Sequence, residues 1–399
     1  MSKKEVCKRI ALNSALVLAS LLATLLVLEI VLERGPILQT PLKFHFALSD
    51  SARFLAQSSK RSPLPADYIA LVGDSYAQGK GDWMLDADHQ RNAPFHSAHL
   101  LQQRTGVDVV SFGWRHRGSV GGFVVEPSAI FPFLKRHVDA DLAQPRQVLA
   151  YFYAGNDLAD NLLDLRRDFF PKHSAAELND PAALNAFADA AIAHRRGVGP
   201  FGHLPLHRGW LLNAMGRTLG NSLQPHKDDD VVWNGTPAGS VNMARIQAAA
   251  VALPNALQGP ALDLTEEEID QAFRLLDLSL ERLQRLFDQS RLTVVYVPSV
   301  LESYELVSPQ VSYSDMLGKP KVAETAALQE RGPRLCARVR EAALRHGAAF
   351  IDTRPAVRAA AKNQTIHGPK DWLHFNRAGY EALTDGILDQ PRGDCAAAM

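Results

Sequence analysis

The chain has 399 residues, of which 46% are hydrophobic, so it can bury a full core and is not a disordered protein. Its 43 Lys and Arg residues balance 43 Asp and Glu residues, which leaves no net charge and no electrostatic reason to expect a nucleic-acid partner. This length predicts one large domain with a sizeable insertion, or that domain plus a cap.

The N-terminus carries the strongest compositional signal. Residues 10–32 are dominated by Leu, Ala, Val and Ile, and they follow a basic segment with Lys3, Lys4, Lys8 and Arg9. As a helix this run reaches about 35 Å, enough to cross a hydrocarbon core of about 30 Å. Because basic residues stay on the cytoplasmic side, we expect an uncleaved transmembrane signal-anchor: residues 1–9 cytoplasmic, the rest on the periplasmic or extracellular side of the inner (cytoplasmic) membrane. A cleaved signal peptide is the alternative, but the run is long and no small-residue cleavage site follows it.

The remaining chain is predicted to form a tether and one α/β domain. Residues 33–66 contain four prolines and no sustained period, which predicts the tether, and the domain takes residues 67–399. Short apolar runs typical of buried strands lie at 67–75, 107–113, 146–157, 291–299 and 348–353. Helical patterns lie between and after them, at 96–106, 121–138 (interrupted by proline), 265–290, 327–347 and 376–388. The clearest helix opens with a capping box formed by Thr265 and Glu268.

This alternation predicts a flavodoxin-like, doubly wound parallel sheet of about five strands. Residues 160–264 interrupt the alternation, and we expect an insertion that caps the site. In such sheets the loops at the carboxyl ends of the strands form the site. Cys336 and Cys395 would lie in an oxidising compartment, where they either pair or remain separate thiols.

The stretch LVGDSYAQGKGDW, residues 71–83, allows two interpretations, a phosphate-binding loop or a turn that exposes a nucleophile. A phosphate-binding loop ending in Gly79-Lys80 would need Gly at 74 and Ser or Thr at 81, and the chain has Asp74 and Gly81. The other reading places Ser75 at a strand-to-helix turn, with its N–H at a helix N-terminus where an oxyanion would be stabilised. A serine that merely caps an ordinary helix is an equally good reading of this stretch alone.

Two further strand ends favour a nucleophilic serine. Asp371 and His374 stand three residues apart, so one short segment can present an imidazole and the carboxylate that orients it. Asn156 follows another strand and could aim its amide at the oxyanion. Taken singly, His374 could be a surface histidine and Asn156 a turn residue, but one topology brings all these strand ends together.

The segments LVGDSYAQG, FGWRHRGSVGG, AGND and DWLH, in this order, resemble the blocks of the SGNH (GDSL) hydrolase superfamily. The resemblance implies a nucleophile Ser75, a general base and acid His374, and an orienting carboxylate Asp371. It also implies an oxyanion hole made by the Ser75 N–H, the Asn156 side chain and the N–H of a glycine in the second block.

Two blocks depart from the family pattern. Ala154 precedes Gly155 in the third block, a mild change. In the second block Ser111 stands where the family usually has Asn, and four residues separate the two glycines. We choose Gly118 as the oxyanion donor, with Gly113 or the His116 backbone as rivals.

The resemblance leaves the substrate open. Similar membrane-anchored bacterial SGNH proteins act on O-acetyl groups of cell-envelope or secreted polysaccharides, which favours an esterase or O-acyltransferase on a carbohydrate O-acyl ester. Its partners would be polysaccharide-modification or export proteins of the membrane. The alternatives are a lipid ester or thioester hydrolase, and a non-catalytic glycan-binding scaffold of an export machine. Aromatic side chains that would suit a sugar face are Trp83, Trp114, Tyr153, Trp233, Tyr304 and Trp372, although any one of them is more often packing.

We expect no cofactor and no bound metal. Pro205 between His203 and His207 disrupts a helical metal-ligand pair, and the chain has no C-x-x-C motif.

Overall fold

The computed structural model describes residues 3–33, 36–39, 50–82, 97–115, 118–135, 141–197, 239–389 and 395. Five strands form one parallel sheet in the order β2-β1-β3-β6-β9. Their bounds are β1 Tyr68–Gly73, β2 Asp108–Ser111, β3 Gln147–Tyr153, β6 Arg291–Val297 and β9 Ala349–Asp352. β2 lies at one edge beside β1, and β3, β6 and β9 follow on the other side of β1 in chain order. This is the order of a flavodoxin-like sheet, which the sequence predicted.

Helices cover both faces of this sheet because the strands are apolar on both sides. Every residue of β1 is buried. Tyr68, Ala70 and Val72 pack in one core with the helices α6 Glu126–Phe133, α7 Asp157–Asp164, α10 Glu266–Leu286 and α11 Thr325–Arg345. Ile69 and Leu71 face the other core, which contains the helices α3 Ser75–Gln78, α5 Ser97–Thr105, α12 Arg354–Ala361 and α13 Arg377–Leu388.

The insertion has two described parts. The first runs from a π-helical turn at Leu165–Phe169 through a 3₁₀ turn at Ala175–Asn179 to α8 Pro181–Gly197. It packs against α10 and the π-helical turn Val120–Val125, in a third core around Phe169 and Leu275. The second part contains the hairpin β4 Met243–Ile246 and β5 Ala249–Ala252. The role of the whole insertion as a cap stays a prediction, since residues 198–238 are outside the described ranges.

Besides α12, a second hairpin and a 3₁₀ turn lie outside the sheet and were not predicted. A second hairpin, β7 Gln310–Ser314 with β8 Pro320–Glu324, precedes α11. A 3₁₀ turn at Leu301–Ser303 follows β6. The disulfide between Cys336 and Cys395 ties residue 395, near the C-terminus, to α11, so of the two alternatives for these cysteines the structure has the pair.

Part of the segment predicted as a tether is folded onto the domain. After a 3₁₀ turn at Pro36–Gln39, α2 Asp50–Ala56 places Phe54 in the core of the sheet. Gln57 then exchanges two hydrogen bonds with the backbone of Ser111, and the Ser59 carbonyl accepts the Val109 N–H. These residues cover the edge strand β2, so the folded region begins before residue 67, the boundary that we expected.

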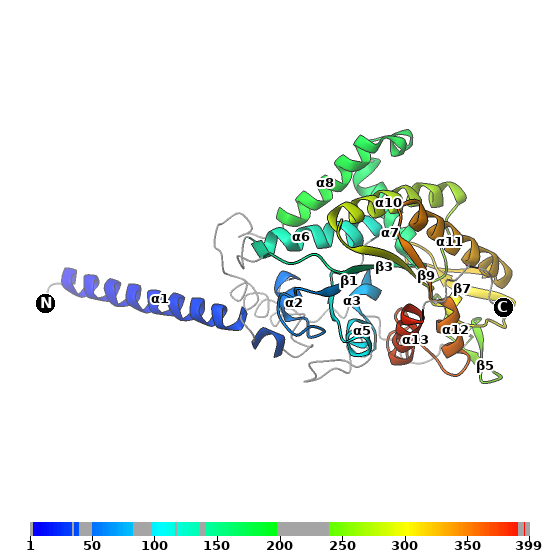
Figure 1. Ribbon diagram of the computed structural model, residues 1–399, viewed down its shortest axis with the longest axis horizontal. Helices are drawn as coiled ribbons and strands as arrows, with labels where there is room; N and C mark the ends of the chain where they lie inside the picture. The colour runs from blue at the N-terminus through cyan, green and yellow to red at the C-terminus, as the bar shows by residue number, and fades with distance from the viewer. Residues whose placement is uncertain are drawn as a thin grey trace.

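The N-terminal helix α1, Lys3–Glu33, lies apart from these layers (Figure 1). Its stretch Glu5–Leu28 is long and apolar enough to cross a membrane, a property that signal sequences share. Side chains such as Ile10, Leu12 and Val17 are exposed, as expected for a helix whose apolar surface no protein core covers.

Candidate active site

The turn after β1 is shaped by its backbone. Gly73 has φ +144°, and a Cβ there would lie 2.7 Å from the Tyr151 carbonyl oxygen, so only glycine fits. Asp74 caps α3 by accepting the Tyr76 N–H at 2.9 Å. Ser75 is therefore the first residue of α3 and does not cap it, and the short helix ends at Gly79 in the left-handed conformation.

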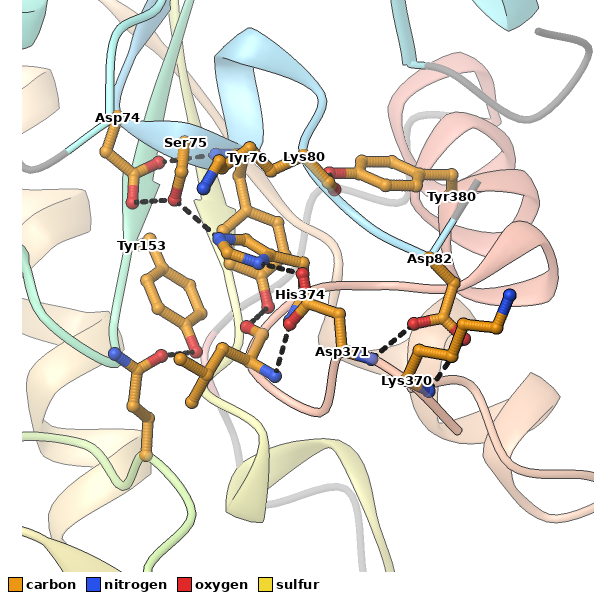
Figure 2. Close-up of polar contacts among 12 residues, drawn as sticks. Asp74, Ser75, Tyr76, Lys80, Asp82, Tyr153, Lys370, Asp371, His374 and Tyr380 are labelled. Carbon is orange, nitrogen blue, oxygen red and sulfur yellow. Dashed lines mark hydrogen bonds and ion pairs between the residues drawn. The ribbon is translucent and has the colours of Figure 1, made fainter. Parts of the chain in front are cut away.

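A chain of hydrogen bonds joins the three residues predicted to act together (Figure 2). The Ser75 Oγ lies 2.9 Å from His374 Nε2, and His374 Nδ1 lies 2.6 Å from Asp371 Oδ2. A carboxylate only accepts, so Nδ1 carries the proton and Nε2 is left to accept the Ser75 hydroxyl. The other oxygen, Asp371 Oδ1, accepts the backbone N–H groups of Leu373 at 2.9 Å and His374 at 3.2 Å.

The electrostatics keep this carboxylate ionised. Burial alone would raise the pKa of Asp371, but the charge and hydrogen bond of His374, together with the Leu373 N–H and the charge of Lys80, outweigh burial and lower it. An ionised Asp371 holds the tautomer of His374 described above and would stabilise an imidazolium.

Two more buried carboxyl groups lie behind Ser75. Burial raises the pKa of Asp74 to about 6, against opposing hydrogen bonds and the charge of His374. Burial, followed by the charge of Asp74, raises the pKa of Asp157 well above its usual value. One Asp157 oxygen accepts the Tyr153 N–H at 3.0 Å, which fixes the turn at the end of β3.

The predicted oxyanion donors differ in how the structure places them. Asn156 is the N-cap of α7, yet its side chain makes no capping hydrogen bond, and its Oδ1 is buried without a partner among the described residues. Gly118 packs against α7, where a Cβ would lie 2.4 Å from Asn161 Oδ1. The N–H of the rival Gly113 already donates to Ser111 Oγ at 3.1 Å. His116 lies outside the described residues, and the donor role of Gly118 stays a prediction.

The aromatic residues considered for a sugar face mostly serve as packing. Tyr153, Tyr304 and Trp372 are buried, with exposed fractions of 1%, 4% and 8%. Trp114 is partly exposed, and the Arg53 guanidinium lies 4.5 Å from the centre of its ring. The backbone N–H of Trp114 donates to the Gly73 carbonyl at 3.1 Å. Two tryptophans and the histidine pair considered above lie outside the described residues: Trp83, Trp233, His203 and His207.

Sequence reasoning missed several residues that build the site. Gly122 lies against the nucleophile turn, since a Cβ there would come within 2.7 Å of the Gly73 carbonyl group. The Tyr76 hydroxyl donates to the Leu373 carbonyl at 2.8 Å, and the Asp82 carboxylate accepts two N–H groups of the loop that bears His374. The only sequence signal for these residues was their place within or beside the matching blocks, which says nothing about the contacts.

A serine, histidine and aspartate linked in this way at the carboxyl edge of a parallel sheet form the arrangement of serine-dependent acyl hydrolases. The sequence profile of the GDSL-like Lipase/Acylhydrolase family matches residues 71–382, and the chain belongs to that family. No curated protein matches the sequence.

A solved structure with low similarity is that of a carbohydrate esterase family 2 enzyme plus carbohydrate binding domain from Corynascus thermopiles (Myceliophthora fergusii). It shares 12% sequence identity at a TM-score of 0.34, and the alignment covers 82% of this chain and 66% of that chain. This chain thus spans slightly less than two thirds of that protein, and the likeness is too low to inform the substrate.

Proposed function

We propose that the protein is a serine-dependent esterase or O-acyltransferase that acts on O-acetyl groups of a cell-envelope or secreted polysaccharide. The observation that carries the proposal is the hydrogen-bonded chain from Ser75 Oγ through His374 to Asp371, with distances of 2.9 and 2.6 Å. Membership of the acylhydrolase family supports the ester as the reacting group.

The chemistry follows from the hydrogen bonds. As Ser75 Oγ attacks the acyl carbon, its proton passes to His374 Nε2, and Asp371 stabilises the imidazolium. The negative charge on the carbonyl oxygen is stabilised by the Ser75 N–H, the Asn156 amide and the Gly118 N–H. His374 then gives the proton to the leaving sugar oxygen. Water attacks the resulting serine ester in an esterase, and a sugar hydroxyl attacks it in an O-acyltransferase.

The proposed location is the inner membrane, with residues 1–9 in the cytoplasm and the α/β domain on the periplasmic side. The apolar helix α1 supports the anchor. The Cys336–Cys395 disulfide supports an oxidising compartment for the domain. An anchored enzyme of this kind would meet a glycan as it is made or exported at the membrane, beside the proteins that modify or export it.

The test uses the full chain in detergent, with Ser75→Ala as the matched inactive variant. Acetate release is measured from O-acetylated oligosaccharides, and hydrolysis is compared between p-nitrophenyl acetate and p-nitrophenyl palmitate. We expect release from the acetylated sugars, preference for the acetyl ester, and loss of both in Ser75→Ala. Transfer would be detected as acetyl groups appearing on an unacetylated glycan. A preference for palmitate would instead indicate a lipid hydrolase, and no turnover by the folded protein would indicate a scaffold.

A further inference from the structure

Asp82 connects the segment that carries the nucleophile to the loop that carries Asp371 and His374. Its side chain is buried, with a residue exposure of 7%. One carboxylate oxygen accepts the Lys370 N–H at 3.2 Å, and the other accepts the Asp371 N–H (Figure 2). Both oxygens of Asp82 therefore hold the backbone immediately around the carboxylate that orients His374.

The neighbouring contacts make these two segments one unit. The Tyr380 hydroxyl donates to the Lys80 carbonyl, and the Tyr76 hydroxyl donates to the Leu373 carbonyl at 2.8 Å. Gly81 lies so close to the second segment that a Cβ would meet the Phe375 carbonyl oxygen at 2.4 Å. Among these contacts, the Asp82 carboxylate is the group that accepts the N–H groups of Lys370 and Asp371. Hydrogen bonds to a carboxylate are stronger than those between neutral groups.

We infer that Asp82 is a positioning residue: it sets the place of Asp371 and, through Asp371, the alignment of His374 with Ser75. The inference rests on the proposed function, in which these three residues carry out acyl transfer. Asp82 itself touches none of the reacting atoms. Its effect is on the fraction of molecules in which the hydrogen-bonded chain is aligned, and a displacement of about 1 Å in such an arrangement costs roughly 100-fold in rate.

Asp82→Asn tests this without changing the volume of the side chain. An amide has one oxygen and one NH₂ group, so one of the two loop N–H groups would face a donor and lose its hydrogen bond. We expect kcat for p-nitrophenyl acetate to fall about 10- to 100-fold with KM within about twofold, as for other residues that orient a reacting side chain. The rate of serine labelling by a fluorophosphonate should fall by the same factor, because labelling needs the aligned Ser75 and no glycan contacts.

Asp82→Ala, which removes both bonds, should lose more activity, and Asp82→Glu, which keeps both oxygens, should recover part of it. Asp315→Ala is the matched control. Asp315 also accepts two backbone N–H groups, from Leu317 at 2.9 Å and Lys319 at 2.8 Å, but in the turn between β7 and β8. We expect Asp315→Ala to lower the unfolding temperature and to leave kcat and the labelling rate unchanged.

All variants are compared in the full chain, together with Ser75→Ala. Asp82→Asn with kcat and labelling rate within about twofold of wild type would overturn the inference, and so would an equal loss of activity in Asp315→Ala. Neither result contradicts the proposed function as long as Ser75→Ala is inactive. A folded wild-type chain that neither turns over nor becomes labelled contradicts the proposed function itself, and the inference with it.

Discussion

Asp371→Asn should disable the site while leaving its shape intact. Asp371 Oδ1 accepts two backbone N–H groups, from Leu373 and His374, so in the variant the amide oxygen is drawn to that position. The NH₂ group then faces His374 Nδ1, which is 2.6 Å from Asp371 Oδ2 in the wild type. Because the NH₂ group donates, His374 Nδ1 must accept, and the imidazole proton moves to Nε2. A protonated Nε2 can no longer take the proton of Ser75. The wrong tautomer in a serine protease costs about 10⁴ in kcat, and we expect about 10³ to 10⁴ here.

The assay is hydrolysis of p-nitrophenyl acetate between pH 5 and 9, with thermal unfolding measured in parallel. The unfolding temperature should change little, because the substitution conserves volume and the Oδ1 hydrogen bonds. Activity within about tenfold of wild type in Asp371→Asn, beside an inactive Ser75→Ala, would refute the argument that Asp371 sets the tautomer of His374.

Three more predictions concern stability and the nucleophile turn. Gly122→Ala puts a Cβ 2.7 Å from the Gly73 carbonyl group, so we expect a loss of about 1–3 kcal/mol in unfolding free energy and at least a tenfold slower fluorophosphonate reaction; unchanged labelling would contradict it. Replacing Cys336 and Cys395 together by Ala opens a loop with a sequence separation of 59, which should cost up to about 4 kcal/mol in urea unfolding; a loss below about 1 kcal/mol would contradict it. Because burial raises the pKa of Asp74 to about 6, its stabilising contribution is complete below about pH 4 and is lost as the pH rises through 6. The Asp74→Asn side chain cannot ionise. The unfolding free energy of the variant minus that of the wild type should therefore rise by up to about 3 kcal/mol from pH 4 to pH 7, and a difference that does not vary with pH would contradict this.

The sheet was predictable because its strands are buried on both faces. Each of the five apolar runs became a strand, and the capped helix from Thr265 began where its capping box placed it. The proximity of Ser75, Asp371 and His374 followed from topology, since loops at the carboxyl ends of parallel strands meet at one edge.

What sequence reasoning missed depends on contacts that leave no periodic pattern. Residues 57–60 read as a polar linker, yet they join the edge of β2 through hydrogen bonds from Gln57 and Ser59. The short hairpins lack the long apolar runs of the central strands. Asp82 carried no signal in the sequence, and the role inferred for it depends on Lys370 and Asp371, almost three hundred residues further along the chain. Such pairings are visible only once the fold brings the two segments together.

The most direct test of the central claim is the intact mass of the full chain after exposure to a fluorophosphonate, measured beside Ser75→Ala. The account predicts a single adduct in the wild type and none in the variant. No adduct on the folded wild type, or an adduct that survives in Ser75→Ala, would contradict the claim that Ser75 is an activated nucleophile.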